Sequence, residues 1–269
     1  MTIWKSTAGL IVALCLAASS AAEPTEITVH VISKGAKFIG SSMGGVSITL
    51  RDARTGELLA QGTTQGTTGD TEKIMEEKHG RGDALSTRQA ASYTATLELE
   101  EPRLIEVTAY GPLAQRQSAG RVSATQWVVP GRHINQGDGW LLQMPGLIVD
   151  ALAPPAHIKL PGAQTIKLHA NVTMMCGCPI TPDGLWDADR FEIRAVVRRD
   201  GKRVAELPMR YAGTPSQFRV EYEAAEPGVY DALIYAHQPS NGNTGLDRTT
   251  WIIAPSEGQD YGSSSRNSG

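Results

Sequence analysis

Short runs of alternating apolar and polar residues recur from Glu26 onward, and they constrain the fold more than any other feature of the chain. Such alternation puts apolar side chains on one face of a β-strand and polar side chains on the other. It predicts a first series of strands at residues 27–31, 46–50, 94–99, 104–107, 122–129 and 140–142. A second series is predicted at residues 165–173, 191–198, 204–207, 218–222, 230–236 and 251–253.

One charged segment interrupts the first series, and a pair of prolines stands between the two series. Residues 70–79 begin with Asp70, a residue that favours helix N-caps, so a short helix or an ordered loop is expected there. Pro154-Pro155 is typical of a linker. Because 269 residues are enough for two domains, we expect an N-terminal β-sandwich at residues 23–150 and a C-terminal β-sandwich at residues 151–254.

Two segments resemble known sandwich families. Residues 44–62 contain the hairpin pattern Asp52-x-x-Thr55-Gly56 and resemble the strand-turn-strand of transthyretin-like and carboxypeptidase-regulatory-like domains. Residues 227–236, in which Tyr230 enters a strand directly after a Pro-Gly turn, resemble the penultimate strand of immunoglobulin-like and fibronectin-III-like domains. The resemblance implies an all-β fold of two tandem immunoglobulin-like sandwiches, and it implies no activity.

The two ends of the chain lack the strand pattern. Residues 1–22 carry Lys5, then a short apolar run, then small residues, which is typical of a cleaved signal peptide; the run is too short for a membrane anchor. We therefore expect a periplasmic or secreted protein with no membrane span in the mature chain. Residues 255–269 are rich in Ser and Gly and are expected to be disordered.

Charge and motifs exclude several classes of function. Lys and Arg total 25 against 28 for Asp and Glu, so no basic excess favours nucleic-acid binding. No His-Glu-x-x-His motif occurs, and no glycine-rich loop is followed by a phosphate-binding lysine. The sequence thus favours a binding protein over an enzyme, and no catalytic residue is assigned.

Soft sulfur donors are concentrated in residues 174–178, which read Met174-Met175-Cys176-Gly177-Cys178. Signal cleavage removes Cys15, so Cys176 and Cys178 are the cysteines of the mature chain. Thiolate and thioether ligands select Cu(I) over harder ions, whereas a zinc site would more often use paired Cys-x-x-Cys units. The segment therefore predicts a copper site with both cysteines and Met174 or Met175 as ligands.

The expected fold brings one histidine near this segment. If residues 165–173 and 230–236 are strands B and F of a sandwich, the loops that follow them lie at the same end of the domain. His237 would then be a candidate fourth ligand for Cu(I). His169 is a weaker candidate, because the alternation of residues 166–172 turns its side chain outward.

Three functions remain open at this stage. The leading hypothesis is an exported protein that binds Cu(I) for copper handling or for delivery to a periplasmic partner protein. A second hypothesis makes Cys176-Gly177-Cys178 a dithiol for redox exchange or sulfur transfer, since a Cys-x-Cys disulfide closes a small ring and would be readily reduced. The third is a non-enzymatic adaptor that binds another envelope protein through strand edges or loops, with the cysteines incidental to its function.

Overall fold

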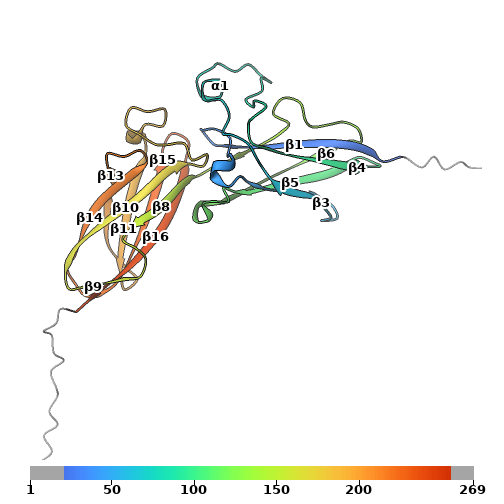
Figure 1. Ribbon diagram of the computed structural model, residues 1–269. Helices are drawn as coiled ribbons and strands as arrows, with labels where there is room; N and C mark the ends of the chain where they lie inside the picture. The colour runs from blue at the N-terminus through green and yellow to red at the C-terminus, as the bar shows by residue number, and fades with distance from the viewer. Residues whose placement is uncertain (1–20, 256–269) are drawn as a thin grey trace, which may run out of the picture.

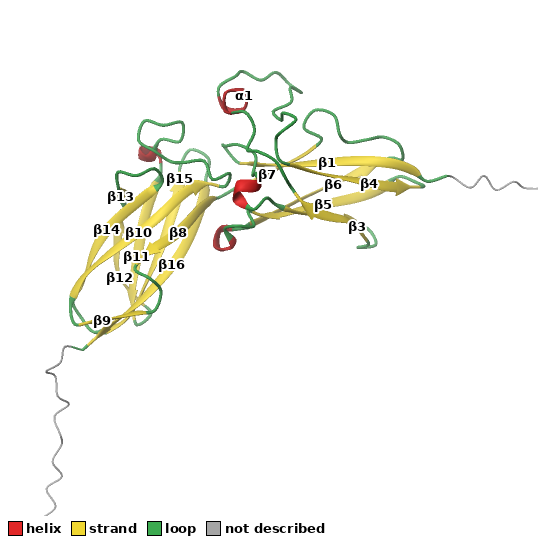
Figure 2. Cartoon of the chain, in the orientation of Figure 1, coloured by secondary structure: helices red, strands yellow, loops and turns green. Residues whose placement is uncertain are grey.

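The computed structural model describes residues 21–255, and these form two β-sandwiches that meet through loops (Figure 1). The expected signal peptide lies almost entirely outside the described residues, as does the expected disordered tail beyond Pro255. Strands dominate both halves, and helices are confined to short segments between strands (Figure 2). The prediction of an all-β, immunoglobulin-like fold is confirmed. Among residues 21–255, no helix has the length and apolarity that crossing a membrane would require.

The N-terminal sandwich packs a three-stranded sheet on a four-stranded sheet. The first sheet has the order β4-β1-β7, with β1 parallel to β7, and the second has the order β3-β2-β5-β6. These strands are β1 (Glu23–Ser33), β2 (Ser47–Asp52), β3 (Leu58–Thr63), β4 (Ser92–Leu99), β5 (Arg103–Gly111), β6 (Gly120–Val128) and β7 (Trp140–Met144). Alternate residues of β1, β2 and β5 fill the core between the sheets, as the sequence pattern predicted.

The C-terminal sandwich packs a four-stranded sheet on a five-stranded sheet, with orders β13-β14-β10-β8 and β12-β11-β15-β16-β9. Its strands are β8 (Leu147–Ala153), β9 (Ile158–Pro161), β10 (Gln164–Met174), β11 (Glu192–Arg199), β12 (Lys202–Pro208), β13 (Arg210–Tyr211), β14 (Gln217–Ala224), β15 (Gly228–Gln238) and β16 (Asn243–Ala254). Its core includes Leu168, Tyr230 and Trp251, and the last two stack with ring centroids 5.3 Å apart.

The domain boundary lies earlier than the sequence predicted. β8 pairs with β10 of the C-terminal sandwich, so the expected boundary after residue 150 falls inside a strand. Only Pro145 and Gly146 separate β7 from β8. Pro154-Pro155 is therefore not the linker between the domains; it joins β8 to β9 within the C-terminal sandwich.

In the described part of the chain, four short helical segments connect strands. The expected helix is α1 (Thr71–Met75), and the Asp70 side chain caps it by accepting a hydrogen bond from the Lys73 N–H. The 3₁₀ turns are η1 (Ser41–Met43), η2 (Arg116–Ser118) and η3 (Ala188–Arg190). Of these, η1 matters most for the rest of the structure, because it carries Met43 to the junction of the two domains.

A buried histidine attaches the loop after α1 to the N-terminal sandwich. His30 of β1 is only 6% exposed, and its Nδ1 lies 3.0 Å from the backbone oxygen of Asp138. Since a carbonyl oxygen only accepts, Nδ1 carries the proton and donates it. The Asp138 carboxylate in turn accepts hydrogen bonds from the Leu85 and Ser86 N–H groups. Burial lowers the pKa of His30 below its ordinary value, and the hydrogen bond to Asp138 only partly opposes this effect.

We expect stability to fall as the pH drops below about 6.5, where the unfolded chain takes up a proton that folded His30 resists. The His30→Gln variant should show a weaker fall in melting temperature between about pH 7 and pH 5 than the wild-type protein. The exposed His79→Gln variant is the matched control and should follow the wild type. Equal pH dependence in all three proteins would refute this role of His30.

Candidate functional site

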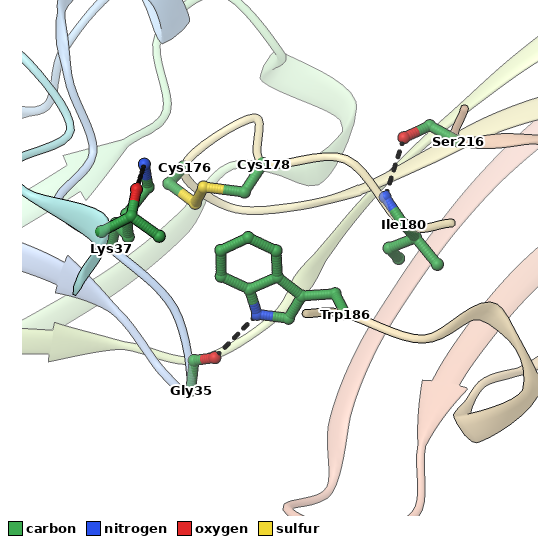
Figure 3. Close-up of a disulfide and its surroundings, with 8 residues drawn as sticks. Gly35, Lys37, Cys176, Cys178, Ile180, Trp186 and Ser216 are labelled. Atoms are coloured by element: carbon green, nitrogen blue, oxygen red, sulfur yellow. Dashed lines mark hydrogen bonds between the residues drawn. A yellow bond between two sulfur atoms is a disulfide. The ribbon is translucent and has the colours of Figure 1, made fainter. Parts of the chain in front are cut away.

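The sulfur-rich segment forms a tight turn directly after β10. The Met174 N–H donates to the Cys178 carbonyl oxygen at 3.2 Å, and the Gly177 N–H donates to the Met174 carbonyl oxygen at 2.8 Å. Gly177 has a positive φ of 75°, a conformation that glycine adopts without steric cost. Within this turn Cys176 and Cys178 form a disulfide, with their Cα atoms 5.3 Å apart (Figure 3).

The two methionines before the disulfide enter different hydrophobic cores. Met174 belongs to the core of the C-terminal sandwich and is fully buried, whereas Met175 belongs to the core of the N-terminal sandwich and is 1% exposed. Adjacent residues of an extended chain point in opposite directions, and here the two directions lead into two domains. The turn therefore joins the sandwiches, and both predicted thioether ligands are used as core residues.

Met43 is a residue of this site that the sequence did not indicate. It comes from η1 of the N-terminal domain, and its Sδ would lie 2.4 Å from a Cβ atom placed on Gly177. The Met43 thioether therefore rests against the glycine that separates the two cysteines. No local pattern could have identified it, because its position depends on how the two domains pack.

Hydrogen bonds fix the loop after β1 to the same region. Trp186 Nε1 donates to the Gly35 carbonyl oxygen at 3.0 Å, below the disulfide in Figure 3. The Lys34 ammonium donates to the Asn241 carbonyl oxygen at 2.7 Å, and the Asn243 amide donates to the Lys34 carbonyl oxygen at 2.9 Å. Asn243 also accepts a hydrogen bond from the N–H of Gly146, which lies in the two-residue connector between β7 and β8. One buried side chain therefore binds both the loop after β1 and the connector between the domains.

The disulfide is enclosed by these contacts. Cys176 is 2% exposed and Cys178 is 5% exposed, and both pack in the same core cluster as Trp186. A thiolate from another molecule must reach a sulfur atom to exchange with a disulfide. The turn must therefore separate from its neighbours before either cysteine can react.

His237 does not join the cysteines. It lies on β15 next to Ala236, which is fully buried between the sheets, so alternation turns the imidazole to the outer face. Its Nδ1 is 3.5 Å from a Glu192 carboxylate oxygen on the neighbouring strand β11. The sequence placed His237 in the loop after a strand that ends at residue 236, and this was wrong, because β15 continues to Gln238 and holds His237 within the strand.

The donor set at the junction consists of sulfur. Across residues 21–255, no three His, Cys, Asp or Glu side chains gather closely enough to hold a metal ion. What the turn offers after reduction is two thiols, from Cys176 and Cys178, together with the thioether of Met43.

Comparisons with known proteins found distant structural similarity and identify no family. No protein-family model matches the chain, and no curated protein matches its sequence. Fibronectin(III)-like modules of CbhA from Clostridium thermocellum are similar in structure over 87% of this chain and 94% of theirs, at 12% identity and a TM-score of 0.27. A DUF3823 family protein from Bacteroides uniformis is similar over 87% of this chain and all of its own, at 11% identity and a TM-score of 0.28. Titin domains Z1Z2, solved with telethonin, match at 10% identity and a TM-score of 0.24, over 87% of this chain and 96% of theirs.

The strand topology defines the chain as a two-domain, immunoglobulin-like β-sandwich protein. Its particular feature is a Cys-Gly-Cys disulfide turn placed where the two sandwiches meet.

The hydrogen bond from Trp186 should contribute measurably to the junction. The Trp186→Phe variant leaves the Gly35 carbonyl oxygen without its donor, and we expect a loss of about 1–3 kcal/mol in the free energy of unfolding. Trp127→Phe makes the same change at a side chain that is 53% exposed, and should cost at most about 0.5 kcal/mol. Urea denaturation measures both values, and an equal cost at the two sites would contradict this account of the junction.

Proposed function

We propose that this protein is exported to the periplasm and binds Cu(I) at the domain junction, through Cys176, Cys178 and Met43, for copper handling or delivery. The contact of the Met43 thioether with Gly177 carries the proposal, because it places a third soft donor from the other domain beside the two cysteines. The signal-like pattern of residues 1–22 supports the compartment.

The proposed ligand set differs from the one that the sequence favoured. His237 is left out because it faces Glu192, and Met174 is left out because it fills the C-terminal core. Three sulfur ligands suit Cu(I), which prefers thiolates and thioethers and accepts low coordination numbers. Met175 remains close to the turn but serves the N-terminal core.

Metal binding requires the disulfide to be reduced first. In the proposed step, a dithiol of a partner protein gives two electrons and two protons to the Cys176–Cys178 disulfide and becomes a disulfide itself. Cu(I) then displaces the two thiol protons and binds the thiolates. Because both sulfur atoms are buried, the step includes a local opening of the turn away from Trp186 and Met43.

A second candidate function is that of an envelope adaptor. Trp127 on the edge strand β6 is 53% exposed, with the Arg54 guanidinium 4.8 Å from its ring centroid, and the neighbouring Val129 is 44% exposed. Exposed aromatic side chains on a sheet edge are suited to binding another protein. Partner binding that is lost in Trp127→Ala and unaffected by cysteine replacement would favour this function over copper binding.

Competition with a chromogenic Cu(I) chelator tests the leading proposal. The reduced mature protein should take a single Cu(I) from the chelator, and the double variant Cys176→Ser with Cys178→Ser should lose this binding. We expect Met43→Leu to weaken the affinity at least about tenfold, which corresponds to about 1.4 kcal/mol for the loss of one ligand.

Met209→Leu is the matched control, because it makes the same change at a buried methionine of the C-terminal core, between β12 and β13. It should bind Cu(I) as the wild type does. If the double cysteine variant competes as well as the wild type, the protein is not a copper protein of this kind. If the cysteines matter but Met43→Leu and Met209→Leu behave alike, Met43 is not a ligand.

A further inference from the structure

Three basic side chains form a row across the outer face of the C-terminal sheet. His169 of β10 is paired with Arg219 of β14, and Arg219 is paired with Arg210 of β13. Residues directly opposite each other in antiparallel strands project to the same face. The buried neighbours Ala170 and Phe218 point into the core, so the row faces outward. Figure 2 shows β10 and β14 side by side in this sheet.

Within residues 21–255, the two arginines of this row form no ion pair. In the part of the chain that the structure describes, no carboxylate oxygen lies within 4.0 Å of the Arg210 or Arg219 guanidinium. On the same face, the next pair along β10 and β14 is Lys167 with Glu221, which balance each other in charge. Like charges directly opposite each other destabilise a sheet. Both arginines are exposed, so water screens their repulsion and their guanidinium groups are accessible to an anion.

A pocket of about 340 Å³ lies on this row. His169, Arg219, Lys167 and Glu221 line it together with two small apolar side chains, Ala153 and Ala212. Ala153 is the β8 partner of His169, next to a bulge that sets Leu152 out of register. Pockets that bind small ligands begin at about this volume and combine apolar walls with a few polar groups.

One nitrogen at this pocket is left without a partner. His169 Nε2 is buried, and within residues 21–255 it makes no hydrogen bond. Buried polar atoms are nearly always hydrogen-bonded, and an exception needs a specific reason. Because this atom is closed off from solvent, a ligand can accept a hydrogen bond from it only after the imidazole turns into the pocket.

We propose that this pocket binds a small organic carboxylate, whose oxygens are held by the Arg219 guanidinium, and by His169 Nε2 once the imidazole turns toward the pocket, and whose apolar part lies against Ala153 and Ala212. A guanidinium offers two parallel N–H donors that match a carboxylate. Arg210, beside Arg219, adds a second positive charge. The small volume favours a free ligand over a segment of a partner protein. This site is separate from the cysteine turn and does not depend on copper binding.

Titration of the full-length mature protein with succinate, followed by ¹H–¹⁵N NMR, tests the proposal. We expect saturable shifts in the amides of β10 and β14 around His169 and Arg219, and no such shifts with the neutral analogue succinamide. The Arg219→Gln variant should weaken succinate binding at least about tenfold, as expected for loss of a charge-assisted hydrogen-bond pair. Arg132→Gln, which removes one exposed positive charge from the N-terminal domain, should bind as the wild type does.

The melting temperature of Arg219→Gln separates ligand binding from a structural role. It should equal or exceed that of the wild type, because the variant removes the repulsion from Arg210. A clear fall would show that Arg219 stabilises the sheet and would overturn the assignment. Equal weakening by Arg132→Gln, tighter binding of inorganic phosphate than of succinate, or binding of a glutamate-rich peptide in place of succinate would also overturn it.

Discussion

The packing of the two domains against each other depends on one short turn, whose side chains are buried in the cores of both sandwiches. Met174 and Met175 are neighbours in sequence, yet each fills the core of a different sandwich, and the disulfide that follows holds the chain between them. Leu147 and Ile148, the first two residues of β8, divide in the same way between the two cores. The domains are therefore joined by shared apolar packing as well as by the linker. This packing holds the domains more firmly than the polar contacts that are typical of flexible domain pairs.

This dual burial explains why the sulfur atoms that could do chemistry are also those that are hardest to reach. Cys176 and Cys178 are enclosed by Trp186 and by the loop after β1, and Met43 covers Gly177. In the proposed function, the same contacts that keep the disulfide closed supply the third ligand once it is reduced. Metal loading and the contact between the domains would then be coupled, because the ligands come from both.

Much of the fold follows from local sequence, and the site does not. Alternation identified β1, β2, β10 and β15 because each has one face in a core. It missed the start of β8, where Leu147, Ile148 and Val149 are all buried and no alternation exists. Pro154-Pro155 was mistaken for the linker because prolines also end strands inside a domain. Met43 was beyond sequence analysis, since its contact with Gly177 is tertiary. The prediction for His237 was wrong because β15 continues past residue 236, which keeps the imidazole on the outer face of the sheet instead of in the loop.

The central claim is that reduction turns this junction into a sulfur site for Cu(I) with one ligand from the N-terminal domain. X-ray absorption spectroscopy of the reduced, Cu(I)-loaded protein tests it most directly, because the copper edge reports the number and type of ligand atoms. The account predicts a first shell of three sulfur atoms that falls to two in Met43→Leu. A shell containing nitrogen or oxygen, or one that is identical in wild type and Met43→Leu, would contradict it.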